Sequence, residues 1–136
     1  MTPNQSVVLL RLALALVWLW TGIVCLFVAP IGESLKLLDP VGIHGAAGRW
    51  TVWLTSGFEI VLGVALATGR FPRLMAAVQV AMICGFTLII TIFLPGWWLH
   101  PFGPISKNVV LIAAALAVER LGGSSTAGTA VSPERS

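Results

Sequence analysis

Apolar residues are grouped in four long runs along this chain, and shorter polar segments separate the runs. The runs cover residues 12–29, 50–68, 74–94 and 105–121. A helix that crosses a bilayer needs about 20 mostly apolar residues, because the hydrocarbon core is ~30 Å thick and a helix rises about 1.5 Å per residue. Prolines, which can begin or end a helix, lie between the runs: Pro30, Pro72, Pro95, Pro101 and Pro104. The pattern predicts an all-α integral membrane protein, in which residues 1–121 form a bundle of four transmembrane helices.

Composition narrows the class of protein further. Of the 136 residues 57% are hydrophobic and only 10% are charged, whereas soluble domains have roughly 25% charged residues. A short soluble domain needs polar side chains over its proportionally large surface. The composition therefore excludes an ordinary soluble enzyme, a disordered chain and a nucleic-acid-binding module. The first run is too long for a secretory signal and contains Trp18 and Trp20, so we expect it to be a retained span.

The positive charges predict the orientation, because cytoplasmic loops carry an excess of Lys and Arg. The side with the two termini and the loop between the second and third runs carries five of them: Arg11, Arg70, Arg73, Arg120 and Arg135. The other side carries three: Lys36, Arg49 and Lys107. Both termini are thus expected in the cytoplasm, with the protein in the inner membrane of a bacterial cell. An aromatic belt would then lie at the outer interface, formed by Trp50, Trp53, Trp97 and Trp98.

Two segments outside the runs also have a predictable character. Residues 31–38 alternate polar and apolar positions, which predicts one short interfacial helix that ends at Asp39-Pro40. Residues 122–136 are rich in Gly, Ser, Thr and Ala and cannot bury much apolar surface. We expect them to form a disordered cytoplasmic tail.

Glu59 is the most informative residue for function. It lies inside the second run, and no charged residue lies within nine positions on either side. A carboxylate in hydrocarbon costs several kcal/mol unless it is paired, protonated or hydrated. Its helix carries a stripe of small and polar residues that should face the bundle: Thr55, Ser56, Glu59, Gly63 and Ala67. Two interpretations stand: Glu59 handles protons or binds a ligand, or it is a buried polar clamp between helices.

Lys107 and Asn108, at the outer start of the fourth run, are the natural partners of Glu59. Glu59 lies ~13 Å below the outer end of its helix, and the long stem of Lys107 could reach toward it. A direct or water-bridged pair would keep Glu59 ionised, and without it the carboxyl group should be largely protonated. Arg49 is a second possible counter-ion, but it lies too high on a straight helix for direct contact.

The remaining polar residues suggest less specific roles. His44 and His100 lie on the outer side without the spacing of a metal site, so no metal is predicted. Gln79, in the third run, is expected to form a hydrogen bond with another helix. Cys25 and Cys84 differ in depth by roughly 10 Å, too far for a disulfide, and are interpreted as packing residues.

Several segments resemble the DoxX-like family of membrane proteins. HPFGPISKNVVLIAAALAV, residues 100–118, resembles the family's last span, in which a turn with Pro and Gly and then Lys-Asn precede a helix rich in Leu and Ala. SGFEIVLGVALATG, residues 56–69, resembles its E-x-x-L-G helix. RLALALVWLWTGIVCLF, residues 11–27, resembles its first span through W-x-x-x-G. The match is closest to the branch with His-Pro-Phe before the last helix, some members of which are fused to domains like nucleotide-sugar epimerases.

The resemblance implies a four-helix transmembrane bundle and a redox-associated function. Relatives are associated with thiosulfate:quinone oxidoreduction, with membrane-bound oxidative-stress complexes and, in the MauE group, with maturation of periplasmic redox proteins. This chain lacks a cysteine pair that could act as a redox centre, and it has Cys25 where first spans of the family often place a Lys. The resemblance thus leaves open whether the protein is itself an enzyme or a subunit of a quinone- or thiol-linked oxidoreductase.

Three functional hypotheses follow. In the first, a redox-associated subunit binds quinone or a lipid-like molecule beside Glu59, Lys107 and Asn108, with Ser56, Arg49 and His100 as further candidates. In the second, the bundle is a non-catalytic scaffold that docks a partner. In the third, it is a small transporter or proton path, which four spans without a repeat disfavour in a monomer but which a dimer could form. The expected partners are the lipid bilayer, a membrane or periplasmic redox protein and a second copy of the chain, but no nucleic acid.

Overall fold

The computed structural model describes residues 2–100 and 105–127, and this part of the chain is helical, without strands. The elements follow one another in this order: α1 (Pro3–Ile23), the π-helical turn η1 (Val24–Val28), α2 (Ile31–Leu38), the 3₁₀ turn η2 (Asp39–Val41), α3 (Gly45–Thr68), α4 (Pro72–Phe93), the 3₁₀ turn η3 (Pro95–Leu99) and α5 (Ser106–Ala127). The predicted all-α fold is confirmed, and the short helix α2 has the predicted bounds.

Three of the helical segments are long and apolar enough to cross a membrane: Pro3–Val28, Gly45–Thr68 and Pro72–Phe93. They match the first three predicted spans. The fourth predicted span lies in α5, which is not among them. Lys107, Glu119 and Arg120 leave α5 with an uninterrupted apolar stretch of only ten residues, 109–118, or ~15 Å of helix. The side chains of α5 are described only to residue 122, so the four-span count is not confirmed; the described helices number five because α2 is a separate short helix.

The bounds of α1 and α5 differ from those of the predicted runs. α1 begins at Pro3, nine residues before position 12, because Thr2 caps it. The Thr2 side chain accepts a hydrogen bond from the Gln5 backbone, and the Gln5 side chain accepts one from the Thr2 backbone. α5 continues to Ala127, beyond position 121, because each added residue of a formed helix gains one backbone hydrogen bond. The rest of the predicted tail, 128–136, lies outside the described residues.

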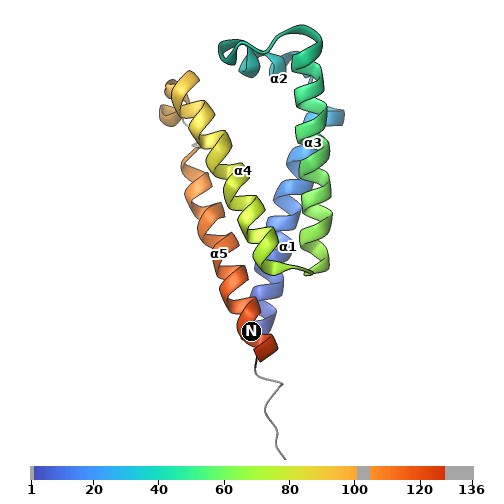
Figure 1. The fold of residues 1–136 in the computed structure, drawn as a ribbon, viewed down its shortest axis with the longest axis vertical. Helices are drawn as coiled ribbons and strands as arrows, with labels where there is room; N and C mark the ends of the chain where they lie inside the picture. The colour runs from blue at the N-terminus through green and yellow to red at the C-terminus, as the bar shows by residue number, and fades with distance from the viewer. Residues whose placement is uncertain (1, 101–104, 128–136) are drawn as a thin grey trace, which may run out of the picture.

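The helices pack as a bundle in which α1 contacts both α3 and α5, and α4 contacts α5 (Figure 1). The tight turn between α3 and α4 lies at the same end of the molecule as the start of α1 and the end of α5 (Figure 1). From this turn α3 and α4 diverge toward the other end, where α2 lies next to α3 (Figure 1). The bundle is therefore closed at one end and wider at the other.

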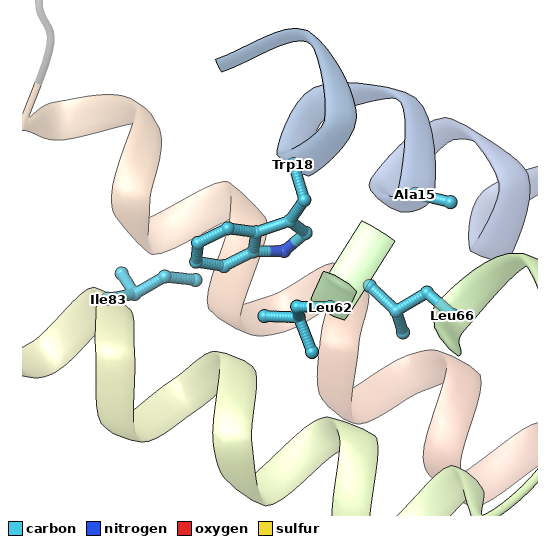
Figure 2. Packing of buried hydrophobic residues seen from close by; sticks show 5 residues of the cluster. All are labelled: Ala15, Trp18, Leu62, Leu66 and Ile83. Atoms are coloured by element: carbon cyan, nitrogen blue, oxygen red, sulfur yellow. The ribbon is translucent and has the colours of Figure 1, made fainter. Parts of the chain in front are cut away.

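A small core joins α1 to α3 and α4. Figure 2 shows Trp18 and Ala15 of α1 next to Leu62 and Leu66 of α3 and Ile83 of α4. A Cβ atom at Gly63 would lie 2.9 Å from the Ala15 carbonyl oxygen, and one at Gly22 would lie 2.6 Å from the Ser56 carbonyl oxygen. These two glycines therefore allow α1 and α3 to pack with their backbones close together.

Candidate functional site

A cavity of about 280 Å³ lies at the wide end of the bundle. The residues that line it come from η1, α2, η2, α3, α4 and the start of η3, so α2 forms part of its wall. Apolar side chains predominate: Leu37, Leu38, Val41, Val52, Phe86, Ile89, Ile90 and Leu94. Polar groups come chiefly from one side, η1 and α3: Cys25, Thr51, Thr55, Ser56 and Glu59. A largely apolar cavity with a few convergent polar groups is typical of a small-molecule site.

Glu59 is the charged residue of this wall. Only 7% of its surface is exposed, and its Oε2 atom is fully buried without a hydrogen-bond partner among the described residues. Buried polar atoms in folded proteins nearly always have a partner. The carboxyl group therefore has an unused hydrogen-bonding position beside the cavity.

Cys25 and Ser56 lie next to Glu59. The Cys25 thiol lies close enough to the Ser56 and Glu59 side chains to interact with both. Cys25 belongs to η1, the π-helical turn that closes with a 2.8 Å bond from the Ala29 N–H to the Val24 carbonyl. Such turns are frequent at functional sites. The sequence favours packing for Cys25 but also allows its face of the helix, shared with Trp18 and Gly22, to line a pocket, and the position of η1 places Cys25 in the cavity wall.

The neighbouring threonines use their hydroxyl groups within α3. Thr55 Oγ1 donates to the Thr51 carbonyl at 2.7 Å, and Thr51 Oγ1 donates to the Ala47 carbonyl at 2.9 Å. Both hydroxyl protons therefore already form hydrogen bonds with the helix backbone. The polar groups of this wall that keep free capacity are the Glu59 carboxyl group and its neighbours Ser56 and Cys25.

The predicted stripe on α3 is largely buried. Ser56, Glu59 and Gly63 are buried and Thr55 is half-buried, as expected for a face toward the bundle. Ala67 is exposed, so that part of the prediction is wrong. Ala67 is exposed because it lies near the end of α3, where Leu66 is the last residue that packs into the core.

Lys107 and Asn108 do not join Glu59. Lys107 is exposed, and the ion pairs within the described residues include none between it and Glu59. Asn108 Nδ2 donates to Thr87 Oγ1 of α4 at 2.7 Å. At this end α5 lies on the far side of α4 from α3 (Figure 1), so α4 separates these residues from the Glu59 helix.

The other candidates lie around the cavity or outside it. Arg49 is exposed near the start of α3. The His100 ring stacks on Trp97 with centroids 5.3 Å apart, and Trp97 lines the cavity, so His100 lies at its rim. His44 Nδ1 lies 3.0 Å from Asp39 Oδ1 in an exposed pair. Within residues 2–100 and 105–127, no three His, Cys, Asp or Glu side chains gather as a metal site would require.

The charged pair on α2 lies in solvent above the cavity. Lys36 Nζ donates to Glu33 Oε1 at 2.8 Å, and this hydrogen bond with Glu33 raises the pKa of Lys36. Both side chains are mostly exposed, so the pair contributes little to stability. Glu59 is therefore the acidic residue that lines the cavity.

Comparison with known proteins supports the resemblance seen in the sequence. Residues 15–116 match the model of the DoxX-like family. Neither the curated proteins nor the solved structures include a significant match to the chain. The matched segment reaches from α1 through most of α5 and includes Cys25, Ser56 and Glu59. The match covers three quarters of the chain, which therefore belongs to the DoxX-like family.

Proposed function

We propose that this small membrane protein binds an apolar molecule with a polar end, a quinone or a lipid-like compound, in the cavity beside Glu59. The observation that carries the proposal is the unpartnered Oε2 atom of Glu59 in the wall of a cavity of about 280 Å³. A hydrogen-bonding group of the ligand would supply the missing partner. The apolar wall formed by α2 and α4 would contact the rest of the ligand.

The same atom argues against Glu59 as a clamp between helices. A clamp needs a partner on another helix, and Glu59 Oε2 has none among the described residues. Gln79 is such a clamp, because its Oε1 accepts a 3.1 Å hydrogen bond from Trp18 Nε1 of α1. The bundle thus has its polar connection elsewhere, which favours the ligand-binding interpretation of Glu59.

The cavity is accessible from the surface of the bundle. Leu37 and Ile89 both line it and are 41% and 42% exposed. A volume of about 280 Å³ is at the small end for ligand pockets. It would hold a ring or a headgroup, while an apolar tail would extend past these residues into the lipid.

The role that these residues support is positioning and proton handling. With a quinone bound, the Glu59 carboxyl group can donate a hydrogen bond, and then a proton, to a carbonyl oxygen as the ring is reduced. Ser56 and Cys25 lie beside the carboxyl group in the same wall. The electrons would come from a partner protein, so we propose a redox-associated subunit. The family resemblance favours quinone- or thiol-linked chemistry.

The experiment measures binding of a short-chain quinone to the purified full chain by quenching of tryptophan fluorescence, since Trp97 lines the cavity. Glu59→Gln keeps the shape of the side chain but removes its acid, and it should weaken binding at least about tenfold, or ~1.4 kcal/mol. Glu33→Gln, an exposed acid of α2 outside the cavity, is the matched control and should bind like the unchanged protein. Equal affinity in Glu59→Gln would contradict the proposal.

The alternatives predict different outcomes. If protein from native lipid carries no quinone and added quinone changes neither fluorescence nor melting temperature, the scaffold hypothesis is favoured, and a partner should be recovered from native membranes. Proton flux into proteoliposomes that depends on Glu59 would favour the transport hypothesis.

For the placement of the protein, we propose four spans in a bacterial inner membrane with both termini in the cytoplasm.

A further inference from the structure

A second, smaller cavity lies at the closed end of the bundle, remote from Glu59. It has a volume of about 90 Å³. α1, the turn between α3 and α4, and α5 supply its wall, which includes Arg11, Gly69, Arg70, Gln79 and Ala115. We call it the Arg11 pocket. Two of these residues are cations, and the lining contains no Asp or Glu.

The Arg11 side chain is half-buried and lines this pocket. Its Nε atom is fully buried and has no hydrogen-bond partner within the part of the chain that the structure describes. The guanidinium group lies against Gly69, where a Cβ atom would overlap with it. An arginine near a membrane surface normally extends its head toward water. In Arg11 one donor of the guanidinium group, Nε, is buried and unsatisfied, which is costly unless a partner is supplied.

Neighbouring groups do not supply that partner. Gln79 accepts from Trp18 Nε1 and donates to the Met75 carbonyl at 3.2 Å. Glu119 of α5 lies 3.6 Å from Arg73. Among the described residues Arg11 takes part in no ion pair.

The position of the pocket indicates the kind of anion. The turn between α3 and α4 marks the end of two membrane spans, so the pocket lies at the depth of the lipid headgroups. Arg70, in this turn, is exposed at its rim. Guanidinium groups recognise phosphate with paired hydrogen bonds, and basic pockets between membrane helices bind anionic headgroups.

We propose that the Arg11 pocket binds a phosphate group, with Arg11 as its buried donor and Arg70 as its cation at the rim. A volume of about 90 Å³ admits one headgroup phosphate but no acyl chain. The phosphate comes either from an anionic lipid or from the solvent.

The test uses the full chain in micelles of a neutral detergent and follows its melting temperature. Phosphatidylglycerol is added in one arm, with phosphatidylcholine as its control, and inorganic phosphate in another, with sodium chloride at equal ionic strength as its control. We expect phosphatidylglycerol to raise the melting temperature of the unchanged protein by several degrees, about 5 °C. Arg11→Gln should abolish this rise. Lys36→Gln, which removes a cation at the opposite end, should retain it.

The outcomes separate the sources. A rise with phosphatidylglycerol alone identifies a lipid headgroup, and a rise with inorganic phosphate as well identifies a general phosphate site. If neither probe stabilises the protein, or if Arg11→Gln responds as fully as the unchanged chain, the proposal is wrong. Should Arg11→Gln fail to fold, Arg70→Gln serves in its place and should reduce the rise at least by half. Glu134 lies outside the described residues; if the unchanged chain does not respond and Glu134→Gln does, the anion belongs to the chain itself and the proposal is also wrong.

Discussion

Gln79 and Glu59 are both buried polar side chains in membrane-spanning helices, but their surroundings differ. Gln79 is 1% exposed and forms hydrogen bonds with Trp18 and with its own helix. Glu59 retains an oxygen atom without a partner. The hydrophobic pattern identified both residues and correctly predicted an interhelical bond for Gln79. It could not distinguish their roles, because a partner depends on which helix faces the residue and on the rotamer it adopts.

The bond between Trp18 and Gln79 should contribute measurably to stability. Trp18→Phe and Gln79→Leu each remove one partner of the bond, and the pair of changes should show a coupling of about 1 kcal/mol, within the range known for hydrogen bonds between membrane helices. Unfolding in mixed micelles by denaturant measures it. The exposed bond from Trp98 Nε1 to Thr91 Oγ1, tested with Trp98→Phe and Thr91→Ala, is the control and should show almost no coupling. Strict additivity at Trp18 and Gln79 would contradict the prediction.

Glu59 and Lys107 should behave as independent residues. Lys107 is exposed and α4 separates it from Glu59, so Glu59→Gln should change the free energy of unfolding equally in the natural and the Lys107→Met backgrounds. We expect agreement within about 0.5 kcal/mol, the usual limit for uncoupled sites. A smaller effect of Glu59→Gln in the Lys107→Met background would show that the two side chains pair after all.

At the scale of helices, local sequence signals predicted some elements well and others poorly. The residues of α2 alternate polar and apolar positions before Asp39-Pro40, and the helix has the predicted bounds. The start of α1 was missed because a single charge, Arg11, appeared to end the apolar run. The hydrogen bonds of Thr2 and Gln5 extend the helix past it. The cavity was not predictable from any one helix, since its wall combines η1, α2, α3 and α4.

Contact between α1 and α3 should depend on Gly63. Gly63→Ala places a methyl group within 2.9 Å of the α1 backbone, and overpacking of this kind costs about 1–3 kcal/mol. Gly57, on the same helix, has no atom within 4 Å of a Cβ position. Gly57→Ala should therefore be neutral or stabilise by up to about 1 kcal/mol, because alanine favours the helix. Denaturant unfolding of the two variants checks the prediction, and equal losses would show that close helix approach is not the reason.

For the whole molecule, the divergence of α3 and α4 creates two different ends. The Glu59 cavity occupies the wide end and the Arg11 pocket occupies the closed end. Composition predicted a membrane protein, and the orientation expected from the placement of charge stays a prediction. Neither could show which helices are neighbours, because apolar runs of similar length can pack in several orders. Lys107 is separated from Glu59 because α4 lies between α3 and α5 at the wide end (Figure 1).

The number of membrane-spanning helices can be tested by finding on which side of the membrane the C-terminus lies. α5 runs beside α4 and ends near the start of α1 (Figure 1), although its charges leave an apolar stretch of only ten residues, 109–118. Contact with α1 and α4 can shelter a shorter stretch, since charged residues at helix ends extend toward the interface. We therefore expect reporters of cytoplasmic location, fused in turn to each terminus, to be active in both fusions. If only the N-terminal fusion is active in the cytoplasm, the protein has three spans, and α5 lies on the outer side instead of completing the bundle within the bilayer.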